Sequence, residues 1–268
     1  MKMIKDLPFA INHEQKIHNC FNDVKPSVFL DYDGTLTPIV EDPSKAVLID
    51  KTRELLKRLS SLCNVVIISG RDLMEVQELV SIDDIIYVGN HGLEIANPDG
   101  NHLHDLKLQR FIPLLDDAEE ELKIELRDIP RVTVERKRFT VAVHYRLVND
   151  AHIKTLEKLF DQISTRQKKL QKHYGKKIFE LRPKIDWNKG KTLIYLLNML
   201  NVYEKTLPLF IGDDLTDEDA FKIIQKIGIG IIVGSESRHT SAKYVLRDPI
   251  EVRLFLDGII NLLEKRLR

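Results

Sequence analysis

Two segments far apart in the sequence limit most strongly how this chain can fold. Each is an apolar run that ends in a cluster of aspartates: Val28–Pro38 reads VFLDYDGTLTP and Leu209–Phe221 reads LFIGDDLTDEDAF. Unpaired buried charge is too costly to serve packing, so a strand that ends in carboxylates indicates a functional site. In an open α/β sheet, ligands bind at that end of the strands. The segments therefore predict two neighbouring strands whose aspartates surround one small volume. These aspartates are Asp31, Asp33, Asp213, Asp214 and Asp217.

The cluster of acidic side chains predicts a hard cation. Many carboxylates can share a small volume only around such an ion, and ligation by oxygen alone favours Mg²⁺, which indicates phosphate chemistry. A calcium-binding EF-hand is excluded, because DYDGTL lacks the third acidic or Asn position before the glycine and follows a strand. Taken alone, DLTDEDAF could also be an acidic first turn of a helix, which the helix dipole favours.

Short apolar runs alternate with amphipathic stretches along most of the chain. The expected strands cover residues 28–30, 65–68, 85–88, 209–211, 229–233 and 244–246. Between them, leucines and valines recur at the spacing of a helix face, which core packing explains. Alternation of this kind predicts a doubly wound, mostly parallel α/β sheet that helices cover on both faces.

The alternation breaks between residues 108 and 183. A helix over 111–127, strands over 132–138 and 139–147, a helix over 150–169 and a strand over 177–182 are expected there. This order is typical of an α+β fold. We therefore expect an inserted domain of residues 108–183 within a core of residues 1–107 and 184–268.

One face of the inserted sheet is expected to be polar. Residues two apart in a strand share a face, so the apolar side chains are expected to pack on the helices and the polar ones to face away. The polar side chains are Glu135, Lys137, His144, Arg146, Glu180 and Arg182. A solvated face is the commoner outcome for an antiparallel sheet, whereas mixed donors and acceptors would also suit a polyol.

Composition narrows the class of protein. Lys+Arg and Asp+Glu both number 41, so no overall charge favours nucleic acid or an anionic membrane. The two cysteines form no C-x-x-C pair, and no apolar run reaches membrane-spanning length. The sequence predicts a soluble cytoplasmic protein without nucleic-acid or membrane partners, and it does not indicate an oligomeric state.

Two further segments could bind phosphate. Ser69, Gly70 and Arg71 follow an apolar strand directly, so a hydroxyl and backbone N–H groups lie where a helix begins, a favourable position for an anion. The segment NKGKT at Asn188–Thr192 offers Lys189 at a similar position. A lone Ser or Lys at such a position is more often a cap or a solvated charge.

The order of these motifs resembles a known superfamily. DYDGT, ISGR, an inserted domain, NKGK and GDDLTDED follow one another as do the four motifs of the haloacid dehalogenase (HAD) superfamily with a cap of the C2B type. Within it, the chain resembles the trehalose-6-phosphate phosphatase family in GNHGLE (Gly89–Glu94), VERKRFTVAVHYR (Val134–Arg146) and FELRPKIDWNKGK (Phe179–Lys191). The resemblance begins at about Pro26, and the first 25 residues carry no motif that we can interpret.

The resemblance implies a reaction and its catalytic residues. Asp31 would attack phosphorus and form an aspartyl-phosphate, and Asp33 would act as general acid and then as general base. Ser69 and Lys189 would hold the phosphoryl oxygens, with Asp217 orienting Lys189. The reaction would be the Mg²⁺-dependent hydrolysis of trehalose 6-phosphate to trehalose and phosphate, the last step of trehalose biosynthesis.

The resemblance also implies the metal ligands. Mg²⁺ would be held by the Asp31 carboxylate, the Asp33 backbone carbonyl and Asp213, with Asp214 close by or in contact with these ligands. The ion would neutralise the repulsion between a carboxylate and a phosphoryl dianion.

The remaining expected contacts are to the substrate. Gly70, Arg71, Asn90 and His91 would contact it from the core, and the polar face of the inserted domain would bind the glucosyl unit distal to the phosphate. Three alternatives remain: a phosphatase for sucrose phosphate or mannosylphosphoglycerate, a sugar phosphomutase, and a sugar-phosphate sensor without turnover.

Overall fold

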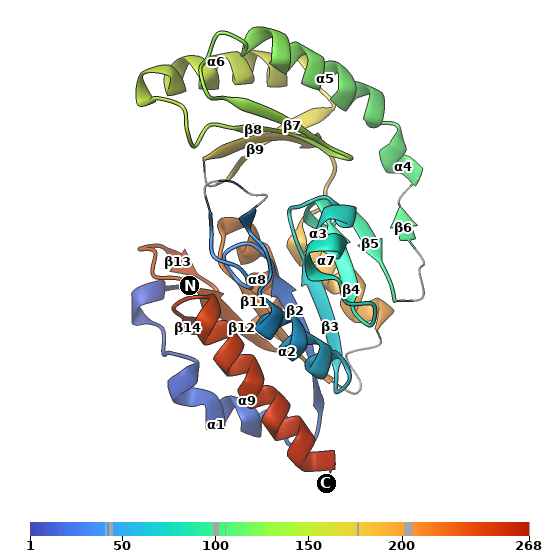
Figure 1. The fold of residues 1–268 in the computed structure, drawn as a ribbon, viewed down its shortest axis with the longest axis vertical. Coiled ribbons are helices and arrows are strands. Elements are labelled where there is room, and N and C mark those ends of the chain that lie inside the picture. Colours follow the sequence, from blue (N-terminus) through green and yellow to red (C-terminus); the bar gives the residue numbers. More distant parts are fainter. Residues whose placement is uncertain are drawn as a thin grey trace. The chain divides into compact units, whose positions relative to one another are not determined.

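A computed structural model of the chain describes residues 1–40, 42, 45–98, 102–104, 106–175, 177–200 and 206–267. The structure divides into two units (Figure 1). Met1–His102 and Trp187–Arg268 form the first, which we call the core unit, and Leu103–Asp186 form the second, which we call the inserted unit.

An eight-stranded sheet carries the acidic segments of the sequence. Its strands, in spatial order, are β14 (Tyr244–Leu246), β12 (Ile229–Val233), β11 (Thr206–Gly212), β2 (Lys25–Asp31), β3 (Asn64–Ile68), β4 (Ile86–Gly89), β5 (Glu94–Ala96) and β6 (His102–His104). Pairing is parallel from β14 through β4, and β4 pairs with β5 in the antiparallel sense. These pairings confirm the predicted α/β sheet with parallel strands.

Helices cover both faces of this sheet. They are α1 (Glu14–Asn19), α2 (Asp50–Ser60), α3 (Leu73–Val80), α7 (Lys189–Met199), α8 (Glu218–Ile224) and α9 (Pro249–Leu267). Alternate side chains of β2 belong to different clusters: Val28 and Leu30 pack with α1, α2, α3 and α9, whereas Phe29 packs with α7 and α8. Because both faces of β2 pack against helices, its side chains must be apolar on both sides. This explains the uninterrupted apolar runs in the sequence.

The order of the central strands brings the motifs together. β2 lies between β11 and β3, with Leu30 opposite Ile211 and Asp31 opposite Ile68. All three strands run in the same direction and end level with one another. The loops that follow them therefore start at the same edge of the sheet.

The first residues of the chain also take part in the core. β1 (Lys2–Met3) pairs with β13 (His239–Thr240), and short 3-10 turns at Ile4–Asp6 and Ile11–His13 lead into α1. Ile17 and Phe21 are fully buried in the cluster that contains α9. The sequence pattern did not predict this packing.

The inserted unit consists of an antiparallel sheet with two long helices along one face (Figure 1). The sheet order is β7 (Thr133–Lys137), β8 (Thr140–His144), β10 (Ile178–Pro183) and β9 (Leu170–Gly175). The helices are α5 (Ile112–Glu125) and α6 (Asp150–Arg166), and α4 (Leu106–Gln109) precedes them.

Two of the boundaries expected from the sequence are wrong. The second helix was expected to continue to residue 169, but α6 ends at Arg166 and the unpredicted strand β9 begins at Leu170. The strand expected over 139–147 ends at His144, so Arg146 lies in the turn that follows and is exposed. The expected contact of Arg146 with the substrate stays a prediction, because the residue follows the strand instead of lying within it.

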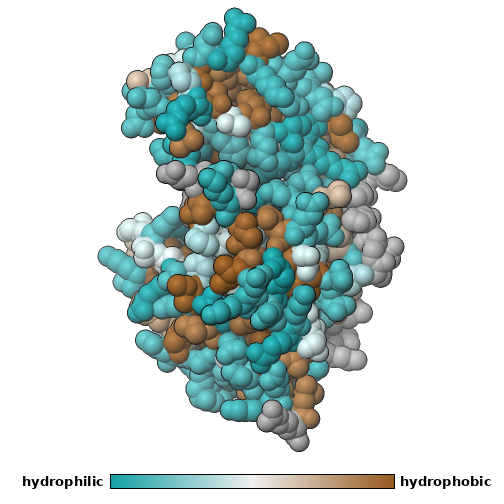
Figure 2. All heavy atoms as spheres, viewed as in Figure 1, coloured by the Kyte–Doolittle hydropathy of each residue, from teal (hydrophilic) through white to brown (hydrophobic). Residues whose placement is uncertain are grey.

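None of the helices in the described part of the chain has the length and apolar content needed to cross a bilayer. On the face drawn in Figure 2, hydrophilic residues predominate and apolar residues form smaller patches.

Candidate active site

The centre of the candidate site is an ion-pair network at the ends of β2 and β11. Asp31 is the last residue of β2, and Lys189 is the first residue of α7. The Lys189 ammonium donates to Asp31 Oδ1 and to Asp217 Oδ1, each at 2.6 Å. All three side chains are buried, so the lysine bridges two carboxylates with little access to water.

Asp217 also organises the loop after β11. Its Oδ2 atom accepts hydrogen bonds from the backbone N–H groups of Asp213 (3.0 Å) and Asp214 (2.9 Å). Both carboxylate oxygens of Asp217 therefore accept hydrogen bonds. The contact fixes the backbone that carries Asp213, while the Asp214 side chain accepts from the Leu215 N–H at 2.7 Å as the cap of the short helix η6 (Leu215–Asp217).

Gly34 allows the loop after β2 to approach Asp213. Its φ of +86° is in the left-handed region, and a Cβ atom there would lie 2.2 Å from Asp213 Oδ2. Glycine is therefore required at this position both for the backbone conformation and for the close approach.

Arg71 holds the second aspartate of the DYDGT motif. Its Nε and Nη2 atoms each donate to one carboxylate oxygen of Asp33 at 2.8 Å, a two-pronged contact that fixes the plane of the carboxylate. Arg71 also pairs with Glu75, one turn further along in α3. The side chain expected to contact substrate is therefore buried and bound to two carboxylates, whereas Asp33 is partly exposed.

Ser69 follows β3 and lies at the same edge of the sheet. The side chain is buried, and its Oγ accepts the backbone N–H of Arg71 at 3.1 Å. The loop after β4 is tied to this segment, because the His91 N–H donates to the Ser69 carbonyl at 3.0 Å. A Cβ atom on Gly70 would lie 2.4 Å from the His91 ring, so Gly70 leaves room for that ring.

Asn90 has a different environment from the one expected. It is fully buried, its backbone N–H donates to the Arg71 carbonyl at 2.7 Å, and its side-chain amide donates to the buried carboxylate of Glu94. Its φ of +47° is also in the left-handed region. These contacts indicate that Asn90 shapes the loop after β4.

The buried charges shift the pKa values of the central pair. Burial raises the pKa of Asp31 well above its ordinary value; Lys189 opposes this shift, and the charges of Asp217 and Asp213 add to it. Burial alone would lower the pKa of Lys189, but the charges of Asp217 and Asp31 raise it. The site therefore favours a charged lysine and has more negative charge than the lysine can balance.

Three buried carboxylates could together hold a metal ion. Among the described residues, one oxygen from each of Asp31, Asp213 and Asp217 lies within 4.8 Å of the others. The Asp214 side chain, which was expected near the metal site, does not belong to this group, and ligation by the Asp33 backbone carbonyl stays a prediction. Because both oxygens of Asp217 already accept hydrogen bonds, Asp31 and Asp213 are the better candidates for direct ligation.

The inserted unit brings its polar residues together on one sheet face. Glu135, Ala142, Glu180 and His173 lie opposite one another across the four strands. His144 Nε2 and Glu135 Oε2 are 2.6 Å apart. Burial acts to raise the pKa of Glu135. The hydrogen bond with His144 and the nearby charge of Lys137 outweigh burial, so the pKa lies below its ordinary value.

A second acidic residue of this face is buried. Glu180 is 4% exposed and pairs with Arg182 on the same strand. Arg136 lies between Glu135 and Lys137 in β7, so its side chain points to the opposite face of the sheet. There it donates to Asp116 of α5 at 2.9 Å. The polar face is thus a network of charged donors and acceptors.

The sequence motifs did not identify two residues that hold parts of the site in position. Glu75 lies four residues after Arg71, a helical spacing at which an ion pair could have been predicted. Arg238 donates to the Asp213 carbonyl at 2.9 Å and to Glu218 at 2.8 Å. It lies in an irregular loop, so no periodic pattern could have revealed it.

Known proteins resemble this sequence over nearly its whole length. The family model for trehalose-phosphatase matches residues 29–250. A probable trehalose-phosphate phosphatase C of Arabidopsis thaliana is 38% identical over 264 residues, covering 95% of this chain and 82% of that protein. Trehalose-phosphate phosphatase B of the same plant is 35% identical over 267 residues, covering 95% and 71%.

A solved structure agrees with these relatives. The crystal structure of a trehalose-6-phosphate phosphatase related protein superposes with a TM-score of 0.79 at 28% identity, covering 89% of this chain and 99% of that one. Neighbours with lower identity include a haloacid dehalogenase-like hydrolase of Bacteroides thetaiotaomicron, which shares the fold. The chain is thus a phosphoric monoester hydrolase, and it belongs to the trehalose-phosphatase family.

Proposed function

We propose that this protein hydrolyses trehalose 6-phosphate to trehalose and inorganic phosphate through an aspartyl-phosphate on Asp31. The observation that carries the proposal is the buried network of Asp31, Lys189 and Asp217 at the carboxyl edge of the sheet. A buried carboxylate held by a single ammonium is a suitable nucleophile, because the lysine neutralises it without blocking its second oxygen.

The acidic group also supports a divalent cation. Three carboxylates share a buried volume with one ammonium. Burial raises the pKa of Asp31, and the charges of Asp217 and Asp213 add to that shift. Asp31 and Asp213 would hold Mg²⁺, whose preference for hard oxygen ligands matches the donor set. When bound, the ion would supply charge neutralisation for the phosphoryl group.

The residues of the core unit then have distinct roles. An oxygen of Asp31 attacks phosphorus in line, the bond from phosphorus to the sugar oxygen breaks, and Asp33 gives that oxygen a proton. Water then attacks the aspartyl-phosphate, Asp33 accepts its proton, and the bond to Asp31 breaks. Lys189 and Ser69 bind phosphoryl oxygens, and Arg71 holds Asp33 in one orientation through its two hydrogen bonds.

The polar face of the inserted unit would select the sugar, as the cap of a HAD phosphatase does. Glu135 and Glu180 supply acceptors, while Lys137 and His144 supply donors, a mixture that suits the hydroxyls of a glucosyl unit. The buried state of Glu180 supports this role, because a merely solvated face does not require a carboxylate with so little exposure.

The test compares two substrates. Glu180→Gln and Lys137→Gln should each lower kcat/KM for trehalose 6-phosphate by about tenfold to a hundredfold, since each leaves a hydrogen-bonding partner unpaired. A small aryl phosphate, which lacks the sugar, should be hydrolysed at nearly the wild-type rate. Glu120→Gln, at an exposed position of α5, is the matched control and should leave both substrates unchanged. Equal losses on both substrates would contradict sugar recognition by this face.

A trapping experiment tests the nucleophile. Asp31→Asn should abolish hydrolysis of both substrates, whereas Asp33→Asn should still accept a beryllofluoride group on Asp31 while failing to turn over. Turnover by Asp31→Asn at the wild-type rate would rule out the aspartyl-phosphate.

A further inference from the structure

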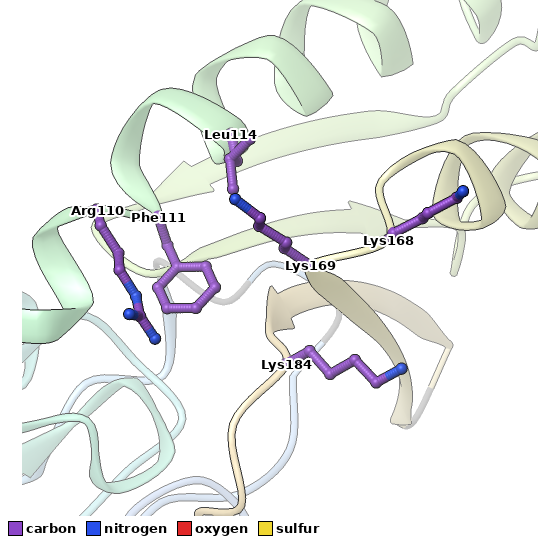
Figure 3. A pocket seen from close by; sticks show the side chains of 6 residues that line it. All are labelled: Arg110, Phe111, Leu114, Lys168, Lys169 and Lys184. Atoms are coloured by element: carbon purple, nitrogen blue, oxygen red, sulfur yellow. The ribbon is translucent and has the colours of Figure 1, made fainter.

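The inserted unit contains a basic cavity that the reaction does not use. Its volume is about 370 Å³, and four of its six lining residues are cationic (Figure 3). The lining residues are Arg110, Phe111, Leu114, Lys168, Lys169 and Lys184. No carboxylate is among them.

Three separate segments of the unit form this cavity. Arg110 and Phe111 lead into α5, Lys168 and Lys169 precede β9, and Lys184 follows β10. The Lys184 N–H donates to the Lys169 carbonyl at 2.8 Å, which continues the β9–β10 ladder by one residue and fixes both backbones. The cavity is therefore built from ordered structure on several sides.

Arg110 is anchored on an apolar surface. Its guanidinium carbon lies 5.1 Å from the centre of the Phe111 ring, and Phe111 is itself buried. This contact favours a position of Arg110 beside the cavity while leaving its donors available. The cavity is thus lined by one arginine and three lysine side chains, of which Lys168 and Lys184 direct their ammonium groups away from Arg110 (Figure 3).

Among the residues that the structure describes, no carboxylate pairs with the cations that line the cavity. Elsewhere in the unit, Arg136 pairs with Asp116, Arg166 with Glu121 and Lys172 with Asp161. Within the described part of the chain, none of the four cations at the cavity has a carboxylate within 4.0 Å. In a protein with equal numbers of acidic and basic residues, this is a local excess of positive charge.

We propose that this cavity binds a small phosphorylated molecule or polyphosphate that carries several negative charges. Lysine ammonium groups and an arginine fork are the usual partners of phosphate oxygens. An extended nucleic acid would require a basic stripe along the surface, whereas these four residues line one cavity.

The position of the cavity in the chain suggests what binding would do. In the sequence, Arg110 follows the start of the inserted unit at Leu103, and Lys184 precedes its end at Asp186. A ligand that contacts both would hold the two ends of the unit together. Binding should therefore protect both ends of the unit from limited proteolysis.

The probe for this site is inorganic tripolyphosphate, titrated into the full chain by calorimetry at low ionic strength in the presence of EDTA. Lys169→Gln/Lys184→Gln should weaken binding at least tenfold. The matched control is Lys154→Gln/Lys158→Gln, which removes two exposed lysines from α6 and the same charge; it should change affinity less than twofold.

Several outcomes would overturn the proposal. Equal weakening by both double variants would indicate general electrostatic attraction, and no weakening by the first would place the probe elsewhere. Loss of binding in Ser69→Ala would assign the probe to the core unit. Tighter, lysine-dependent binding of a single-stranded oligonucleotide or of anionic vesicles would replace the small molecule by a macromolecular partner. None of these readouts depends on turnover, so the result is independent of the proposed reaction.

Discussion

Replacing Lys189 by methionine should destabilise the protein strongly. Met has a similar length but no charge, so Asp31 and Asp217 would remain buried without the ammonium that donates to each at 2.6 Å. The loss of unfolding free energy can be estimated in two ways that nearly agree. Two charge-assisted hydrogen bonds contribute about 1.5–3 kcal/mol each, and breaking a buried ion pair costs about 3–5 kcal/mol. We expect the free energy of unfolding to fall by about 4 kcal/mol, which for a chain of this size lowers Tm by about 8–16 °C.

Urea and thermal unfolding in EDTA at pH 7 measure this loss without a contribution from metal binding. The raised pKa of Lys189 means that its contribution is fully present below the ordinary lysine pKa and is lost only well above it. The double variant Lys189→Met/Asp217→Asn should recover about 2 kcal/mol of the loss, because it removes one of the uncompensated carboxylates. A loss below about 1 kcal/mol, or a double variant less stable than the single one, would refute the reasoning.

Three further predictions concern residues outside this pair. Arg71→Lys cannot form the two-pronged contact with Asp33, so kcat should fall about tenfold with little change in KM, measured by steady-state kinetics. Arg238→Ala removes the donor to the Asp213 carbonyl, which should raise the Mg²⁺ concentration required for half-maximal thermal stabilisation about tenfold. Burial, with the nearby charge of Arg182, lowers the pKa of His173 from 6.5 to about 4, so the unfolded chain binds a proton that the folded one does not. Its stabilising contribution should be lost as pH falls from about 6.5 to about 4, and His173→Asn should flatten the pH dependence of the unfolding free energy over that range.

Two of these predictions have a control variant, and the third has an outcome that would contradict it. Glu75→Gln keeps the contact of Arg71 with Asp33 and should retain most of kcat; a loss as large as that of Arg71→Lys would contradict the orienting role. Arg247→Gln removes an exposed arginine that pairs with Glu251 and should leave the Mg²⁺ dependence unchanged. An unchanged pH profile in His173→Asn would show that other groups cause the acid sensitivity.

The core sheet could be predicted because its signals are local. Each of the parallel strands from β14 through β4 is a short, mostly buried apolar run, and each ends in a loop at the same edge, whereas β6 and the antiparallel β5 were not predicted. Parallel pairing then brings Asp31, Asp213 and Ser69 together without any knowledge of side-chain positions. The contact of Lys189 with Asp31 and Asp217 could be inferred only through the family resemblance, because α7 lies far from both motifs in sequence.

Strand β9 could not be predicted because a lysine takes an apolar position in it. Lys172 lies on the helix side of the sheet, with its ammonium 4.7 Å from the Phe179 ring and 4.3 Å from the Tyr174 ring, and it pairs with Asp161 of α6. The stem of the lysine packs among aromatic side chains while its charge is paired. The alternation of apolar and polar residues that reveals a strand is therefore absent from Leu170–Gly175.

Arg238 shows a different limit of sequence reasoning. It follows β12 in an irregular loop, and it donates to the carbonyl of Asp213 in the loop after β11 and to Glu218, which also accepts the Ser241 N–H at 2.9 Å. In a parallel sheet, loops that follow neighbouring strands must lie side by side, so topology alone predicts that these two loops meet. Which side chain bridges them depends on the loop backbone, which no repeat in the sequence encodes. The aspartates of such a site can therefore be found from strand ends, whereas the residues that hold them in position require the structure.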